Sequence, residues 1–75
     1  MKYIITDQEE VIVGHGYHQE MAAGIGGEVV AAGECEFLVD GWTVYGRSHG
    51  FGIRAKNSDR DILNGLYPNG PTDLK

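Results

Sequence analysis

Residues 34–45 read ECEFLVDGWTVY, and they contain the clearest structural pattern in the chain. Polar and apolar residues alternate from Glu34 to Phe37, as in a strand with one buried face. Asp40-Gly41 follows, a dipeptide that favours a tight type I′ turn, in which both central residues need positive φ. Residues 42–45 supply the return strand. This stretch therefore predicts a β-hairpin.

Two regions before this hairpin also have strand character: residues 2–13, which hold one or two strands, and residues 28–32. Residues 2–6 alternate β-favouring side chains, and residues 7–10 then form a polar break before the apolar residues 11–13. Residues 28–32 are extended by composition. We expect these segments to pair with the hairpin in one sheet.

The chain contains two helical patterns. Apolar residues recur at helical spacing from Tyr17 to Ile25, and Gly26-Gly27 then offers a stop, which predicts a helix of about two to three turns beginning near His18. The second helix is predicted to begin at Ser58, which forms an approximate capping box with Asp61. Its apolar face is Ile62, Leu63 and Leu66, and Pro68 ends it.

These elements predict an α+β fold with a small mixed or antiparallel sheet of about four to five strands packed with two short helices. A chain of 75 residues is long enough for only one domain, so residues 1–75 form a single unit. Residues 69–75 are expected to be a loose tail. Small domains often gain stability by oligomerisation, so a homodimer is one expectation.

Composition narrows the possible partners. The formal net charge of −5 argues against a nucleic-acid partner, which would need clustered Lys and Arg. No apolar run approaches the length of a membrane helix, so no membrane partner is expected. Cys35 is the single cysteine, which fits a reducing compartment, and we expect a cytoplasmic protein.

Residues 46–56 have no clear period and read as a loop that concentrates positive charge. Glycines in its first half let the backbone come close to a small anion, which main-chain N–H groups bind well. Ser48 could add a hydroxyl donor, and Arg47 or Arg54 could add long-range attraction. An ordinary loop between a strand and a helix would have the same composition, so this pattern alone leaves both interpretations open.

His15 and His18 are candidate bases, because a neutral imidazole can accept a proton from water. His18 is placed where the first helix should begin, beside free N–H groups whose dipole favours the neutral ring. A surface or capping histidine is the alternative. His15, His18 and Cys35 are also residue types that bind zinc, so a small metal-binding domain is a third hypothesis.

Four segments, residues 2–5, 17–21, 44–52 and 67–68, together resemble the Janus/Ocnus family of phosphohistidine phosphatases. Residues 2–5 resemble the Lys-Tyr and two aliphatic residues that open the first strand of that family. Residues 17–21 are similar to its Tyr-His-x-Asp-Ile segment, and residues 44–52 to its Val-Tyr-Gly-x-Ser-x-x-Tyr/Phe-Gly segment. Tyr67-Pro68 resembles its Tyr-Pro ending. The matches keep their order and span nearly the whole chain.

The resemblance implies a hydrolase that removes phosphate from phosphohistidine or phospholysine without a metal or other cofactor. It implies that His18 is the catalytic residue and that Lys2 assists catalysis. The phosphate-binding loop would then include Arg47, Ser48, His49 and Gly50. The substrate would be a phosphorylated protein or a small phosphoramidate.

A non-catalytic relative of the same fold is the alternative. Glu34 stands where the family has an arginine, and little chain follows Tyr67-Pro68 to make the family's last strand. Such a relative would bind an anion or a protein, and an unpaired sheet edge would favour a second copy of the chain.

Overall fold

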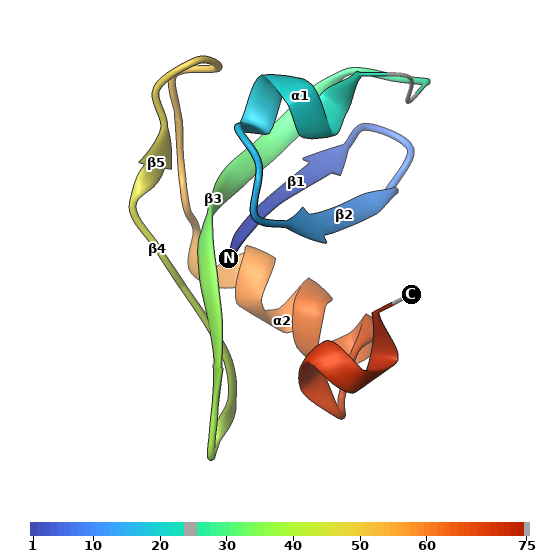
Figure 1. The fold of residues 1–75 in the computed structure, drawn as a ribbon, viewed down its shortest axis with the longest axis vertical. Helices are drawn as coiled ribbons and strands as arrows, with labels where there is room; N and C mark the ends of the chain where they lie inside the picture. Colours follow the sequence, from blue (N-terminus) through green and yellow to red (C-terminus); the bar gives the residue numbers. More distant parts are fainter. Residues whose placement is uncertain (24–25, 75) are drawn as a thin grey trace.

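The computed structural model describes residues 1–23 and 26–74, and Figure 1 shows strands and helices in one layered arrangement. The main sheet is antiparallel and has the strand order β2-β1-β3-β4. Its strands are β1 (Lys2–Thr6), β2 (Val11–Gly14), β3 (Val29–Leu38) and β4 (Gly41–Tyr45). The predicted α+β class is confirmed. Residues 29–38 form one continuous strand.

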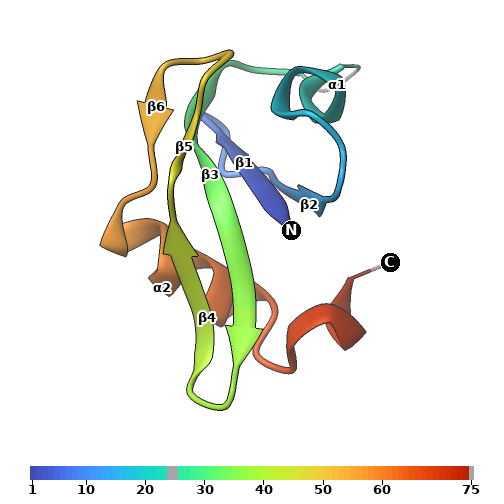
Figure 2. The ribbon, with the colours of Figure 1, turned by 60° about the vertical axis from the view of Figure 1, so that its left-hand side comes forward.

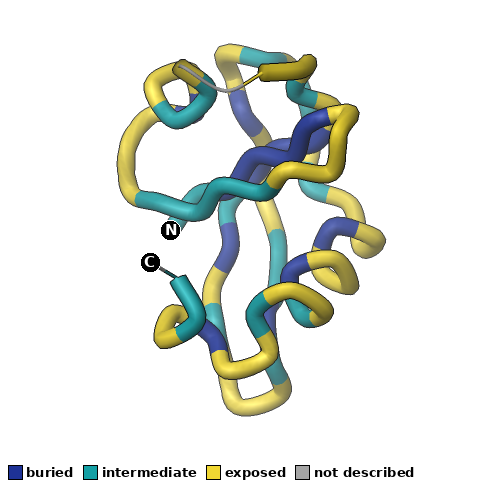
Figure 3. Tube along the Cα trace, turned by 90° about the vertical axis from the view of Figure 1, so that its right-hand side faces the viewer, coloured by how far each residue is buried: buried dark blue, intermediate teal, exposed yellow. Residues whose placement is uncertain are grey.

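The two faces of the sheet carry different residues, because successive side chains of a strand point to opposite sides. Tyr3 and Cys35 lie on the side that packs against the second helix, which we call the α2 face. Lys2, Ile4 and Glu34 lie on the other side, the α1 face, because they alternate with those residues. The buried residues run through the central strands in Figure 3.

The hairpin between β3 and β4 forms as predicted, but its turn is not type I′. Leu38 pairs with Gly41, so Val39 and Asp40 are the central residues of the turn, and neither has a positive φ. Gly41 alone takes a positive φ of 112°. A Cβ there would lie 2.6 Å from Oδ1 of Asn64, so the approach of the second helix also requires glycine at this place.

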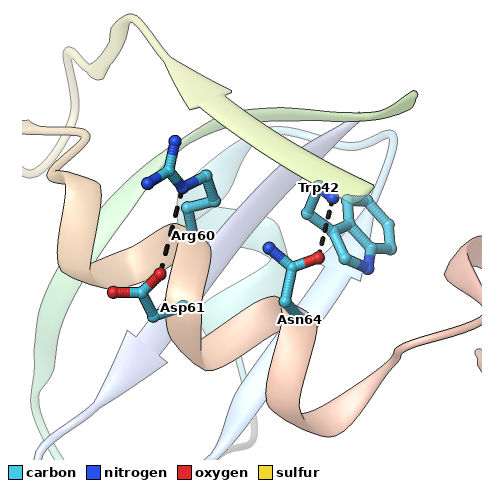
Figure 4. A network of polar contacts seen from close by, with 4 residues as sticks. All are labelled: Trp42, Arg60, Asp61 and Asn64. Atoms are coloured by element: carbon cyan, nitrogen blue, oxygen red, sulfur yellow. Dashed lines mark hydrogen bonds and ion pairs between the residues drawn. The ribbon is translucent and has the colours of Figure 1, made fainter. Parts of the chain in front are cut away.

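Asn64 also closes part of the β4 edge. Its Oδ1 accepts the main-chain N–H of Trp42 at 2.8 Å, and Figure 4 shows this contact between the helix and the strand. The indole N–H of Trp42 donates to the carbonyl of Tyr67, also at 2.8 Å. Trp42 is therefore buried with both of these donors satisfied.

Helix α1 (His18–Ala22) begins at the predicted residue but has only five residues. The expected length of two to three turns is therefore wrong for the described part of the chain. Ala23 has a ψ of 127°, which ends the helix, and the predicted apolar position Ile25 lies outside the described residues. So short a helix depends on packing, and α1 contacts β1 and β2.

Helix α2 (Asn57–Leu66) begins one residue before the predicted cap, and its N-cap is Lys56. Ser58 is therefore not the capping residue. The carboxylate of Asp59 accepts the main-chain N–H of Lys56 at 3.0 Å and the hydroxyl of Tyr3 at 2.6 Å. The bond to Lys56 caps the start of the helix, and the bond to Tyr3 holds the same carboxylate against β1, a contact that a local pattern cannot reveal.

Two departures from the predictions lie after β4. Part of the predicted loop forms a small second sheet from β5 (Arg47–Ser48) and β6 (Ile53–Arg54), which stand beside β3 in Figure 2. The expected loose tail instead contains a 3-10 helix, η1 (Gly70–Asp73), whereas Lys75 lies outside the described residues. Gly70 is buried against the ring of Phe37, and Leu74 packs on the core.

Within residues 1–23 and 26–74, no helix is long and apolar enough to cross a membrane.

Candidate active site

A pocket of about 480 Å³ opens on the α1 face of the sheet. Strands β1 and β3 form part of its wall, the start of α1 forms another part, and the segment from Gly46 to Gly50 closes it. The residues that line it are Lys2, Tyr17, His18, Gln19, Glu34, Gly46, Arg47, Ser48, His49 and Gly50.

The six residues that the resemblance assigns to the site line this one pocket: Lys2, His18, Arg47, Ser48, His49 and Gly50. Arg54, the other candidate cation of the loop, does not line it. The sequence interpretation required that an imidazole and a glycine-bearing turn, about thirty residues apart, meet in space. The fold satisfies this requirement because β3 and β4 carry the chain from α1 across the sheet and back. His15 does not line the pocket.

His18 is buried, with only 7% of its surface exposed. Its Nε2 lies 2.8 Å from the carbonyl oxygen of Gly33. A carbonyl only accepts, so Nε2 carries the proton and Nδ1 is the acceptor of the neutral ring. The described residues leave no buried polar side-chain atom without a partner, and they offer none to Nδ1. Nδ1 is therefore accessible and free of a partner among the described residues, and His18 is one of the residues that line the pocket.

Gly33, whose carbonyl bonds to His18, is closely packed by its neighbours. A Cβ on Gly33 would lie 2.8 Å from Cβ of Ala55 and 3.1 Å from the hydroxyl oxygen of Tyr3. Gly33 thus packs against the α2 face through its Cα while its carbonyl orients His18 on the α1 face. One glycine therefore connects the core to the candidate base.

Ser48 shapes the turn between β5 and β6. Its side chain is fully buried, and its Oγ accepts the N–H of Phe51 at 3.4 Å, while its carbonyl accepts the N–H of Gly52 at 2.8 Å. The sequence interpretation has this hydroxyl donate to the phosphate, and the structure shows its oxygen as an acceptor inside the turn, a role that leaves the O–H donor unassigned. The N–H groups of His49 and Gly50 have no protein acceptor among the described residues. These two donors are free for an anion.

Gln19 is a pocket residue that the sequence did not indicate. A Cβ on Gly50 would lie 2.8 Å from Nε2 of Gln19, so this side chain packs directly against the turn. The contact ties α1 to the segment with the two free N–H groups. A polar residue beside His18 carries no distinctive pattern, so only the folded arrangement reveals its place.

The pocket contains charges of both signs. Lys2 and Arg47 are cations, and Glu34 is the carboxylate that pairs across the sheet with Lys2. The one ion pair within the described part of the chain joins Arg60 and Asp61 at 3.9 Å on α2, so none of the three pocket charges is neutralised by a direct protein partner. Nζ of Lys2 instead lies 5.2 Å from the ring centre of Tyr17.

The zinc hypothesis does not fit this geometry. Cys35 points to the α2 face and is fully buried there, whereas His18 lies on the α1 face. Burial raises the pKa of the Cys35 thiol to about 11, which disfavours the thiolate that binds metals. Residues 1–23 and 26–74 contain no group of three His, Cys, Asp or Glu side chains placed to hold a metal ion.

Comparison with known proteins gives no relative: no family model matches the chain, and neither does any curated protein or solved structure. The resemblance to the phosphohistidine phosphatases therefore stays a prediction that rests on the residues of this sequence.

Proposed function

We propose that the chain is a phosphohistidine phosphatase-like hydrolase, a phosphoamidase that needs no metal and acts on a phosphorylated protein or a small phosphoramidate. One observation carries the proposal: His18, whose Nδ1 has no partner among the described residues, lines the same pocket as His49 and Gly50, whose N–H groups are unpaired there. A general base activates the water, and preorganised N–H donors stabilise the phosphoryl oxygens, so both parts favour phosphoryl transfer to water.

In the proposed reaction, the phosphoryl oxygens lie against the N–H groups of His49 and Gly50. Nδ1 of His18 takes a proton from a water molecule while the water oxygen bonds to phosphorus. The P–N bond breaks, and its electron pair leaves with the nitrogen, which departs as the amine when it is already protonated. The proton on His18 then returns to solvent. The bond from Nε2 to Gly33 keeps the ring in the required tautomer throughout.

Lys2 and Arg47 supply the positive charge in this reaction. Both line the pocket and neither is held by a carboxylate within ion-pair distance among the described residues. An ammonium or a guanidinium near the equatorial oxygens stabilises the charge that spreads over them in the transition state. The cation–π contact with Tyr17 leaves the Lys2 ammonium able to donate to a ligand.

The test is hydrolysis of phosphohistidine and of phosphoramidate, followed by phosphate release. We expect His18→Ala to abolish turnover, a loss of about a hundredfold or more. His18 is buried, so His18→Gln should be measured beside it, because a glutamine amide can still donate to Gly33. His15→Ala is the matched control, since His15 is exposed and outside the pocket. Absence of turnover in the unaltered protein would disprove the enzymatic proposal.

The second candidate is a non-catalytic relative that binds an anion or a protein, and Glu34 favours it. A carboxylate in the pocket opposes a phosphate dianion, which weakens binding of the transition state as well. Such a protein would shift its His49 and Gly50 amide signals on adding phosphate but release none from phosphoramidate. Light scattering over a concentration series would show whether it forms a homodimer.

A further inference from the structure

Glu34 has an unusual place in the pocket. It is half-buried on β3, and its Oε2 would lie 3.0 Å from a Cβ on Gly46, so the carboxylate leans over the first residue of the anion-binding segment. Gly46 has a positive φ of 70°, which turns the chain there toward β5. The carboxylate and the free N–H groups therefore border the same space.

The register of the sheet explains why this carboxylate is available to a ligand. Lys2, Glu34 and Tyr45 are direct neighbours across β1, β3 and β4, so all three side chains point to the α1 face. Lys2 lies opposite Glu34, yet its ammonium lies over the Tyr17 ring, and no ion pair joins the two. The negative charge of Glu34 thus has no direct cationic partner in the part of the chain that the structure describes.

An unpaired carboxylate beside two anion-binding N–H groups suits a ligand with both signs of charge. An O-phosphate or free phosphate brings only negative charge and is repelled by Glu34. A phosphoryl group bonded to a protonated aliphatic nitrogen is a zwitterion, with its cation one bond from phosphorus. That nitrogen can donate to Glu34 while the oxygens accept from the turn. His18 is buried, lines the same pocket, and has no partner for Nδ1 among the described residues, which independently indicates that a ligand binds here.

We propose that Glu34 is the residue that makes this pocket select N-phosphorylated aliphatic amines, protonated on nitrogen, over phosphates that lack the cation. The inference rests on the proposed function for its phosphoryl-binding turn. Glu34 acts by binding the nitrogen, so its removal changes the affinity for the zwitterion relative to the plain anion. His49 and Gly50 bind the phosphoryl oxygens in both kinds of ligand.

The experiment uses two ligands that differ only in the cation, namely aminomethylphosphonate and ethylphosphonate, neither of which has a P–N bond to break. Amide NMR titration at His49 and Gly50 gives each dissociation constant. We expect the unaltered protein to prefer aminomethylphosphonate by about tenfold and Glu34→Gln to lose that preference, mainly through weaker binding of the zwitterion. Glu36→Gln is the matched control, because Glu36 lies two residues along the same strand face, outside the pocket lining. It should keep the preference.

The outcomes separate the two proposals. Equal affinities in the unaltered protein, or an unchanged preference in Glu34→Gln, overturn the role of Glu34 even if phosphoramidate is hydrolysed. A preference that Glu34→Gln abolishes, without any hydrolysis, supports the role of Glu34 and overturns the hydrolase. If neither phosphonate binds, the role of Glu34 is overturned, and turnover of phosphoramidate still decides the hydrolase.

Discussion

The two faces of the sheet differ in whether their polar groups have hydrogen-bond partners within the protein. On the α2 face, the hydroxyl of Tyr3 donates to Asp59, and both donors of Trp42 have acceptors. On the α1 face, no donor among the described residues bonds to Nδ1 of His18. The N–H groups of His49 and Gly50 likewise have no acceptor there. A buried polar group contributes to stability only when it is paired, whereas an unpaired accessible group is available to a ligand. The contrast assigns stability to one face and ligand binding to the other.

The largest expected effect comes from breaking the paired face. Asp59→Ala should lower the free energy of unfolding by about 3 kcal/mol, because it removes a helix-capping acceptor and leaves the buried Tyr3 hydroxyl unsatisfied. Urea unfolding followed by circular dichroism measures this loss. Under conditions where the variant is folded, its His49 and Gly50 amides should still respond to phosphate.

Asp61→Ala is the matched control for this substitution. Asp61 is on the same helix, and Figure 4 shows its contact with Arg60, an exposed pair at 3.9 Å that contributes little. We expect a change within about 0.5 kcal/mol. If the two variants lose the same free energy of unfolding, the Tyr3–Asp59 hydrogen bond does not contribute measurably to the stability of the core.

A smaller effect is expected where the two faces meet, at Gly33. Gly33→Ala should cost about 2 kcal/mol, since its Cβ would collide with Ala55 and crowd the Tyr3 hydroxyl. The displaced carbonyl should also misplace His18, so turnover of phosphoramidate should fall by more than the unfolded fraction explains. Urea unfolding and kinetics on the same sample measure both effects.

Gly65→Ala provides the comparison for Gly33→Ala. Gly65 is in α2, where no atom lies within 4 Å of an added Cβ, and alanine should stabilise that helix by up to about 1 kcal/mol. Its turnover should not change. If Gly33→Ala is destabilised but keeps full activity per folded molecule, the carbonyl of Gly33 does not position His18.

The sequence revealed those parts of the fold that local patterns encode. Alternation over residues 34–37 predicted the second half of β3, and the start of the first helix at His18 was also correct. Residues 28–32 were predicted as a separate segment, but β3 is continuous from Val29 to Leu38. The β5–β6 pair was missed because two-residue strands have no period of their own and depend on contact with β3. Ser58 was chosen as a cap because the pattern cannot show that Asp59 bonds to Tyr3, 56 residues away.

The candidate site divides in the same way. His18 and the turn residues have chemically distinctive types, so the sequence could single them out. The contact of Gln19 with Gly50 depends on how α1 meets the turn, and the place of Glu34 in the pocket depends on the register between β1 and β3. Neither is a property of neighbouring residues, so the partners of a site residue are harder to predict than the residue itself.

The smallest expected effect is that of alkaline pH on the two buried groups of the α2 face, Cys35 and Tyr3. Burial raises the pKa of Cys35 to about 11, and burial followed by the hydrogen bond to Asp59 raises the pKa of Tyr3 above its ordinary value. The folded protein therefore holds these protons more tightly than the unfolded chain. Their contribution to stability is complete below the unfolded pKa values, about 9 for the thiol and about 10 for the phenol. It decreases as the pH rises above them.

We therefore expect the free energy of unfolding to fall by about 1 kcal/mol per pH unit between about pH 9 and pH 10, where Cys35 ionises in the unfolded chain. Above about pH 10 the fall should be steeper, because Tyr3 then ionises in the unfolded chain as well. Cys35→Ala should flatten the first part of this decline and Tyr3→Phe the second, whatever each substitution does to stability at neutral pH. Urea unfolding at half-unit steps of pH measures both slopes. A constant free energy up to about pH 10.5 would mean that water reaches these groups, and the contrast between the faces would then lie in packing rather than in polar pairing.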